Sequence, residues 1–271
     1  MCQTSQHEHK HVENVEVVSN VEIAPRVWMV VLRAPKMAHL LRAGQFVHLL
    51  IDEHLTLRRP FSVCQIRQDE ICIMYAVVGK GTELLTQKKT HDESMSVIGP
   101  CGNSWPHPAV GSKALLVGGG LGAAPLGMLA HELFEAGTDF HFIQAGRTDS
   151  LVIGRGFHES IRRDIEFATD DGSLGFHGLI TEPVKNALQS GEYSVVYVCG
   201  PEIMQRAVVA VCANFQVATY VSLERLMACG IGACLSCNVA TKQGPQKVCV
   251  DGPIFLSEDL EFDDVARSSI H

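Results

Sequence analysis

Four cysteines near the carboxyl end constrain this chain more than any other feature of its sequence. Cys229, Cys234, Cys237 and Cys249 follow a C-x4-C-x2-C pattern, with the fourth cysteine after a longer gap. This is the spacing of plant-type [2Fe–2S] sites, where four thiolates hold the iron. Structural zinc more often takes its ligands as two separated pairs. The pattern therefore predicts a [2Fe–2S] site, with structural zinc or four buried thiols as the alternatives.

Small residues separate these cysteines and suit a loop that wraps around a cluster. Gly230 and Gly232 can adopt positive φ and let the backbone approach the sulfides closely. Ala233 and Ser236 leave backbone N–H groups free to bond to sulfur, which tunes the reduction potential of a cluster.

Composition excludes several other classes of protein. The chain has 271 residues, a formal charge of −8 and ten cysteines. An acidic chain without a basic stripe is not expected to bind nucleic acid. The amino end has no signal-peptide pattern, and the most apolar stretch, 114–130, contains five glycines and a proline. We therefore predict a cytoplasmic protein without a membrane helix. His7, His9 and His11 could bind a metal, although a solvated, mobile terminus is the more typical reading of such a segment.

The first hundred residues have the pattern of an antiparallel β-barrel or sandwich, because short apolar or alternating runs are separated by turn residues. A short helix is expected after Gly81, with Thr82 as its N-cap and Leu84 and Leu85 facing inward. The predicted strands are 12–18, 26–32, 45–51, 61–65 and 71–78.

The pattern changes after a Gly- and Pro-rich stretch at 100–112. Buried apolar strands then alternate with helices, which is typical of a doubly wound parallel sheet. Strands are predicted at 113–117, 140–145, 165–169, 195–199 and 218–222, and helices at 124–136 and 201–213. We expect a β-domain at 1–106, an α/β-domain at 107–222 and a small [2Fe–2S]-binding tail at 223–271.

Two segments of the β-domain could hold a diphosphate from two sides. An arginine at a strand entry can form charge-assisted hydrogen bonds to phosphate. A Gly-x-Gly turn before a helix can present free N–H groups to it. Taken singly, the first segment is more typical of a surface arginine pair and the second of a turn without a ligand. The residues concerned are Arg59, Pro60, Phe61 and Ser62, then Gly79, Lys80, Gly81 and Thr82.

The α/β-domain carries a candidate nucleotide site at its strand ends. A glycine-rich turn follows the first strand and opens a helix, although the acidic residue of the ordinary dinucleotide fingerprint is missing at the end of the second strand. A later strand ends at Cys199, which could lie near a nicotinamide ring or serve only in packing. Asp170-Asp171-Gly172 could border the same crevice or form a simple turn. The candidate residues are Gly118, Gly119, Gly120, Gly122, Cys199, Gly200 and Pro201.

In this order the motifs resemble those of the ferredoxin–NADP reductase superfamily, and more closely the electron-transfer (iron–sulfur) subunits of class 1B dihydroorotate dehydrogenase. The resemblance covers about 12–262. Phe61 stands where that family often has a smaller aliphatic residue. The matching pieces are Arg59–Ser62, Gly79–Thr82, Gly118–Pro125, Thr169–Ser173, Cys199–Pro201, Glu224–Gly230 and Cys249–Pro253.

The resemblance implies FAD on the β-domain, NAD(H) on the α/β-domain and the four cysteines as cluster ligands. It implies a partner, an FMN-containing catalytic subunit that oxidises dihydroorotate, in a heterotetramer with two copies of each subunit. The base acting on dihydroorotate would belong to that partner, so no catalytic residue is predicted here. Related reductase subunits of a sulfhydrogenase or of a ferredoxin:NADP⁺ transhydrogenase share every motif. An iron–sulfur redox sensor or a zinc-stapled interaction protein is the non-enzymatic alternative. Arg147, at a strand end, could favour the 2′-phosphate of NADP, but the resemblance outweighs this one residue and implies NAD.

Overall fold

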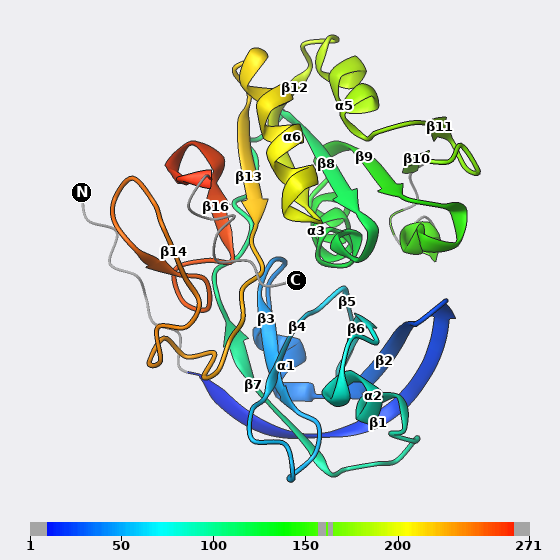
Figure 1. The fold of residues 1–271 in the computed structure, drawn as a ribbon, viewed down its shortest axis with the longest axis vertical. Helices are drawn as coiled ribbons and strands as arrows, with labels where there is room; N and C mark the ends of the chain where they lie inside the picture. Colours follow the sequence, from blue (N-terminus) through cyan, green and yellow to red (C-terminus); the bar gives the residue numbers. More distant parts are fainter. Residues whose placement is uncertain (1–9, 157–160, 162–164, 263–271) are drawn as a thin grey trace.

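The computed structural model describes residues 10–156, 161 and 165–262, which form two seven-stranded sheets and a small two-stranded one. The first sheet is antiparallel, with strand order β4-β3-β7-β1-β2-β6-β5, and it curls so that β1 wraps around one side of the domain (Figure 1). This confirms the predicted antiparallel β-domain. Its strands are β1 (His11–Ala24), β2 (Val27–Arg33), β3 (Phe46–Leu50), β4 (Arg59–Ser62), β5 (Gln65–Arg67), β6 (Glu70–Ala76) and β7 (Met95–Cys101).

Strand β3 is buried on both of its faces. Val47 and Leu49 point into the core of the curled sheet. Phe46 and His48 alternate with them and therefore face outward, yet both are also buried. An outward face that is buried must be covered by another part of the chain. Here the cover is the segment from residue 223 onward that carries the four cysteines, called the cysteine-rich segment below.

Two helices complete this domain, α1 (Pro35–Leu40) and α2 (Lys80–Thr86). The predicted N-cap at Thr82 is wrong, because α2 begins two residues earlier and Gly79 is its N-cap. The Thr82 hydroxyl instead accepts the N–H groups of Val78 at 2.9 Å and Gly79 at 3.1 Å. Leu85 is buried as predicted, and Leu84 is half-buried.

Two strand predictions in this domain also differ from the structure. The run 61–65 is divided between β4 and β5, because the chain leaves extended pairing at Val63 and Cys64. Strand β7 was not predicted, and its end overlaps the stretch at 100–112 where the domain boundary was expected. Its pairing with β1 ends at Gly99, beyond which Pro100 has no ladder hydrogen bond to donate to that neighbour.

The second sheet has the order β11-β10-β9-β8-β12-β13-β16 and is parallel except for its last strand. After β8, the chain adds β9, β10 and β11 on one side of that strand, and then β12 and β13 on the other side. The switch point of the sheet therefore lies between β8 and β12. This confirms the predicted α/β architecture. The elements are β8 (Lys113–Gly119), α3 (Ala123–Glu135), β9 (Asp139–Gly146), β10 (Ile165–Thr169), β11 (Phe176–His177), α5 (Thr181–Leu188), β12 (Tyr193–Cys199), α6 (Glu202–Asn214) and β13 (Ala218–Ser222), with 3₁₀ turns at Gly120–Gly122, Asp149–Leu151 and Ile153–Gly156.

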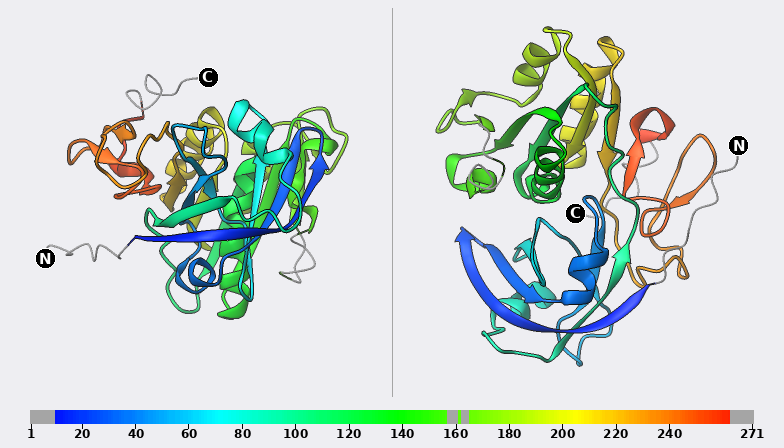
Figure 2. Two further views of the ribbon diagram at one scale, coloured as in Figure 1. Left: turned by 90° about the horizontal axis from the view of Figure 1, so that it is seen from below. Right: turned by 180° about the vertical axis from the view of Figure 1, so that it is seen from behind.

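The cysteine-rich segment is attached to both sheets. Its strands β14 (Asn238–Val239) and β15 (Gln246–Lys247) form the small sheet, and β16 (Ile254–Leu256) pairs antiparallel with β13 and is followed by the 3₁₀ turn Ser257–Asp259. The views from below and behind show the segment lying beside the β-domain and the α/β-domain together (Figure 2).

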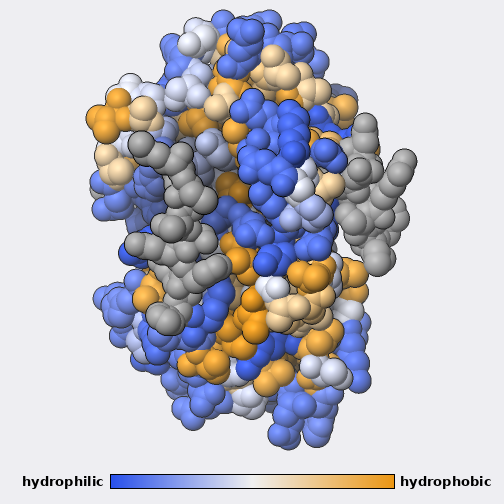
Figure 3. Space-filling view, turned by 90° about the vertical axis from the view of Figure 1, so that its left-hand side faces the viewer, coloured by the Kyte–Doolittle hydropathy of each residue, from blue (hydrophilic) through white to orange (hydrophobic). Residues whose placement is uncertain are grey.

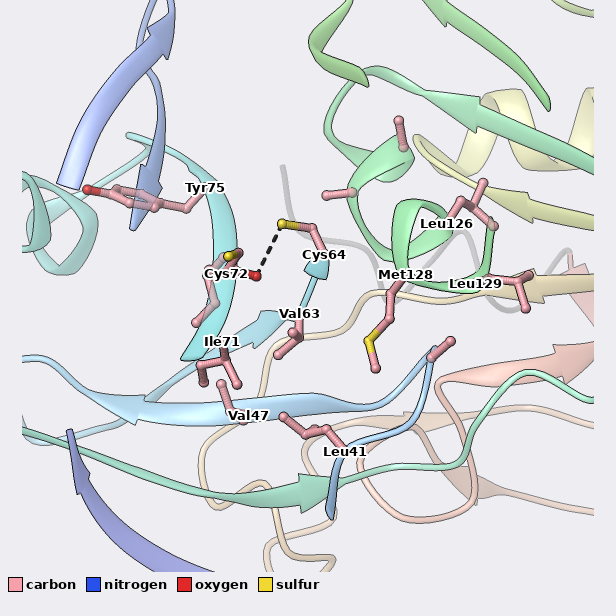
Figure 4. Close-up of a cluster of buried hydrophobic side chains, with 14 of the residues drawn as sticks. Leu41, Val47, Val63, Cys64, Ile71, Cys72, Tyr75, Leu126, Met128 and Leu129 are labelled. Carbon is pink, nitrogen blue, oxygen red and sulfur yellow. Dashed lines mark hydrogen bonds between the residues drawn. The ribbon is translucent and has the colours of Figure 1, made fainter. Parts of the chain in front are cut away.

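The two larger domains share a hydrophobic core. Val63 and Cys64, which follow β4, belong to the same buried cluster as Leu126 and Met128 of α3, on the other side of the domain boundary (Figure 4). The Cys64 thiol donates a hydrogen bond to the carbonyl of Cys72 at 3.1 Å. Because burial raises its pKa to about 12, this thiol stays protonated and serves in packing.

In the part of the chain that the structure describes, no helix is long and apolar enough to cross a membrane. His7 and His9 lie outside the described residues, and His11 is the first residue of β1. Asp171 closes the turn after β10 by accepting the N–H and the hydroxyl of Ser173 at 3.0 and 2.6 Å. That turn therefore has a structural role.

Candidate functional site

The four cysteines of the carboxyl-terminal segment come together as two pairs. The backbone N–H of Cys234 lies 3.4 Å from the Cys229 sulfur. The Cys249 thiol interacts with the Cys237 thiol. Cys237 and Cys249 are buried, Cys229 is partly buried and Cys234 is exposed. The site thus has a buried side and a side that faces solvent.

Backbone geometry of the loop matches the prediction made for its glycines. Gly230 and Gly232 have φ of +68° and +83°. A Cβ at Gly232 would lie 2.7 Å from a methyl group of Val250, and one at Gly230 would lie 2.5 Å from the ring of His48. Glycine is therefore required at both positions by conformation and by space.

The two pairs differ in their electrostatic surroundings. Hydrogen bonds from Ser236, followed by those from Cys229, lower the pKa of Cys234 to about 6. Burial, followed by the neighbouring Cys237, raises the pKa of Cys249 to about 12. The exposed cysteine is therefore a thiolate at neutral pH without any metal, whereas Cys249 loses its proton to solvent when a metal binds its sulfur.

This arrangement fits a binuclear cluster. Two pairs of thiols suit [2Fe–2S], in which each iron takes two cysteines. A single tetrahedral zinc ion would draw all four sulfurs to one point. The N–H groups of Ile231 and Cys234, at 3.5 and 3.4 Å from the Cys229 sulfur, are the hydrogen bonds expected around such a cluster.

The two predicted diphosphate segments lie next to each other in the β-domain. A Cβ at Gly81 would lie only 2.9 Å from Nε of Arg59. The Arg59 side chain therefore rests on the first turn of α2. Nothing lies within 4 Å of the Cβ position of Gly79. An arginine beside an open glycine turn fits the diphosphate of a bound FAD.

The neighbouring residues of these segments have distinct positions. Ser62 and Pro60 pair with Phe46 and His48 of β3. Phe61 packs edge-on against the ring of Tyr75, with 6.0 Å between ring centres. Lys80 opens α2 and is exposed, so it can reach an anion only from the solvent side.

We expect Arg59→Ala to weaken FAD binding about 10- to 100-fold, since a hydrogen bond to a charged group contributes about 1.5–3 kcal/mol. Isothermal titration of the flavin-free protein with FAD measures this. Arg67→Ala is the matched control, because Arg67 is exposed on β5 and bonds to Gln65 at 2.9 Å. Equal FAD affinity in the Arg59 and Arg67 variants would contradict the assignment.

The candidate nucleotide residues also come together. A Cβ at Gly122 would lie 2.5 Å from the backbone of both Cys199 and Gly200. A Cβ at Gly119 would lie 2.2 Å from the sulfur of Met204 and 3.2 Å from the ring of Pro201. The turn after β8 is thus packed directly on the turn after β12, at the switch point of the sheet.

Not all of these glycines are needed for packing. Gly118 packs β8 closely against the start of α3, since its Cβ would lie 3.0 Å from the Cα of Ala123. Gly120 has φ of +53° and open space around it, so its backbone is free to approach a ligand. The strand ends at β8 and β12 are where a sheet of this topology binds nucleotides.

Cys199 is buried at this junction. Burial raises the pKa of its thiol, and the nearby Glu224 carboxylate raises it further. A protonated thiol next to the two turns can pack against a ring but is a poor nucleophile. Gln205 holds the junction together by donating to the carbonyls of Gly200 at 2.7 Å and Ser222 at 2.8 Å.

Two residues near the site were not among the predicted site residues. Arg58 donates to Ser96 at 2.7 and 3.0 Å and to the carbonyl of His48 at 3.3 Å, so it holds β7, β3 and the start of β4 together. His48 lies against the cysteine loop. Burial lowers its pKa, and the backbone of Cys229 opposes that effect. The only feature of the sequence that could have indicated this position is that His48 is the one polar residue in an otherwise apolar strand.

Comparison with known proteins gives consistent results. Residues 224–261 match the family model of the iron–sulfur cluster binding domain of dihydroorotate dehydrogenase B. The electron transfer subunit of dihydroorotate dehydrogenase B (NAD⁺) from Clostridium acetobutylicum is 39% identical over 82% of this chain and 87% of its own length. The subunit of the same name from Geobacillus thermodenitrificans is 38% identical over 92% of this chain and 98% of its own.

Solved structures agree with this relationship. An NADH-dependent reduced ferredoxin–NADP oxidoreductase, described for flavin-based electron bifurcation, has a chain that is 31% identical. The match covers 94% of this chain and 92% of that one, with a TM-score of 0.87. Phthalate dioxygenase reductase shares the fold at 17% identity and a TM-score of 0.63, over 85% of this chain and 87% of its own. The chain belongs to the family of electron transfer subunits of dihydroorotate dehydrogenase B.

Proposed function

We propose that this chain passes electrons between NAD(H) and an FMN-containing catalytic subunit of dihydroorotate dehydrogenase, for pyrimidine biosynthesis. One observation carries the proposal most strongly. The paired cysteines have a buried side packed on β3, next to the candidate flavin strand β4, and an exposed side at Cys234. When bound, FAD exchanges two electrons with a nicotinamide and single electrons with a [2Fe–2S] cluster.

The residues of the chain supply position and environment for these groups. Cys229, Cys234, Cys237 and Cys249 hold the cluster. Arg59 and the turn at Gly79–Thr82 hold the FAD diphosphate, and β4 places Ser62 and Phe61 beside the flavin. The packed turns at Gly118–Gly122 and Cys199–Pro201 orient NAD(H) over the crevice. The protein acts by binding and orienting, and no side chain here is needed as a proton donor for the hydride step.

The partner docks on the exposed side of the cysteine loop. Leu226, Ile231 and Leu235 surround Cys234 in sequence and are 62%, 49% and 57% exposed. The face that carries the cysteine-rich segment shows apolar surface on its lower half (Figure 3). Large exposed apolar side chains beside the exposed cysteine Cys234 indicate a protein interface. We propose a heterotetramer with two copies of each subunit, located in the cytoplasm because the four thiolates require a reducing compartment.

The second candidate is a reductase subunit of a ferredoxin–NADP oxidoreductase. The TM-score of 0.87 and 31% identity to such a chain favour it. The curated relatives, at 38–39% identity in the two examples above, favour the dihydroorotate dehydrogenase partner. Only the partner surface distinguishes the two functions.

Reconstitution tests the proposal. The purified chain, loaded with FAD and cluster, should co-purify with an FMN-containing dihydroorotate dehydrogenase subunit and confer dihydroorotate-dependent NAD⁺ reduction. Leu226→Glu should weaken assembly at least tenfold, because it places a charge where the proposed interface would bury a leucine, whose burial contributes about 1.5–3 kcal/mol. Leu179→Glu is the matched control, since Leu179 is 66% exposed but lies near β11, at the opposite end of the sheet.

The outcomes separate the candidates. Absent activity in a fully loaded complex would reject the dihydroorotate function. Reduced-ferredoxin-dependent NADP⁺ reduction would then support the second candidate. A chain that binds no flavin would instead support the iron–sulfur sensor.

A further inference from the structure

The side chain of His48 lies between the candidate flavin strand and the cysteine loop. It is fully buried, at 0% exposure, on the outward face of β3. Its register partner on β4 is Pro60, within the Arg59–Ser62 segment. On the other side of β3 its register partner is Ile98 of β7. One residue therefore connects the strand assigned to FAD with the loop assigned to the cluster.

Contact between His48 and the loop is close. A Cβ at Gly230 would lie 2.5 Å from Nδ1 of the ring, 2.9 Å from Cγ and 3.1 Å from Cε1. The residue beside Cys229 must therefore be glycine because the imidazole occupies the space that a side chain would fill. The ring thus sets how closely the loop can approach the β-domain.

Neither ring nitrogen of His48 makes a well-formed hydrogen bond within the described part of the chain, although the backbone of Cys229 and of Arg58 lies close enough to act on the ring. A buried polar group without a partner costs about 1–3 kcal/mol, so such groups persist where a ligand satisfies them. An imidazole carries at least one N–H in either protonation state. The charged groups that act on the ring are the guanidinium groups of Arg58 and Arg59, neither of which can accept that N–H.

We propose that His48 is a positioning residue for the [2Fe–2S] cluster. Its ring N–H is directed at the Cys229 side of the cluster and donates to a sulfur there, which stabilises the reduced, more negative state. Hydrogen bonds to cluster sulfurs raise the reduction potential. The inference rests on the proposed function only in taking the four cysteines as cluster ligands.

Three variants of the full chain, purified with FAD and cluster, test this role. His48→Leu removes the N–H and keeps an apolar side chain of similar bulk. His48→Gln keeps an N–H donor. Phe46→Leu is the control, because Phe46 is buried on the same face of β3, two residues away, and has no polar atom. The measurement is a redox titration followed by electron paramagnetic resonance of the reduced cluster, with the FAD potential as internal reference.

We expect His48→Leu to shift the one-electron reduction equilibrium of the cluster about tenfold toward the oxidised state, which is about 59 mV. His48→Gln should recover most of this shift. Phe46→Leu should leave the cluster potential unchanged, and the FAD potential should change in none of the variants.

Several results would overturn the inference. An unchanged cluster potential in His48→Leu would do so, as would equal shifts in the leucine and glutamine variants. If His48→Leu takes up no cluster, the cluster uptake and cluster potential of His48→Gln test the donor role instead. Cluster uptake at the wild-type potential supports the donor role, whereas loss of cluster in both variants, with uptake in Phe46→Leu, leaves only the shape of the ring as the requirement. Absence of a [2Fe–2S] signal in the wild-type chain would reject the proposed function itself.

Discussion

Cys234→Ser is expected to abolish cluster loading while leaving FAD bound. The Cys234 side chain is exposed, so its replacement removes a ligand without disturbing a core, and the free energy of unfolding of the cluster-free chain should change by less than about 0.5 kcal/mol. Iron content should fall to near zero. Dihydroorotate-dependent NAD⁺ reduction in the complex should fall more than 100-fold, whereas oxidation of NADH by ferricyanide through the flavin should persist.

Cys212→Ser provides the control for this result. Cys212 is buried in α6 and is not one of the four candidate ligands, so its substitution should leave iron content unchanged. Placing a hydroxyl at that buried position should lower the free energy of unfolding by about 1–3 kcal/mol. Full iron content in Cys234→Ser would refute the ligand set.

Gly122→Ala should reduce kcat/KM for NADH about 100-fold. The added Cβ would lie 2.5 Å from the backbone of Cys199 and Gly200, so the two turns must separate. A displacement of about 1 Å in a reacting geometry can cost about 100-fold in rate. Stopped-flow measurement of flavin reduction by NADH reports the effect, and flavin and cluster absorbance should remain at wild-type levels.

Gly191→Ala separates this effect from a general loss of stability. Gly191 has φ of +71° and no atom near its Cβ position, so alanine there causes only backbone strain of about 1–2 kcal/mol. It should lower Tm and leave the NADH kinetics unchanged. A Gly122 variant with normal flavin reduction would show that the packed turns do not position the nucleotide.

Local chemistry could be predicted from the sequence because it depends on spacing within short segments. The cysteine spacing and the glycine turn after β8 each lie within one loop, where adjacent residues decide the conformation. Strand β10 and strand β13 were predicted with the bounds that the structure shows, 165–169 and 218–222. Each is a five-residue run enriched in β-branched or aromatic residues, which favour strands.

Features that depend on long-range pairing could not be predicted in this way. The role of His48 requires the pairing of β3 with β4 and the packing of the loop at Gly230 on that strand. Thr82 was misplaced for a more local reason. Threonine is a common N-cap, but here the hydroxyl reaches back from the third helical residue while Gly79 occupies the cap. The diphosphate and nucleotide assignments remain predictions that the variants above address.

The attachment of the cysteine-rich segment bears on whether it can be exchanged or removed as a module. Asn103 binds the carbonyls of Asp251 and Ile254, each at 2.9 Å, and β16 covers the edge of β13. A chain truncated before this segment would leave the edge of β13 unpaired and the buried outward face of β3 open to water. Unpaired edges and apolar faces promote aggregation. The electron-transfer segment is thus also part of the scaffold, so losing it would cost the protein its solubility as well as its function.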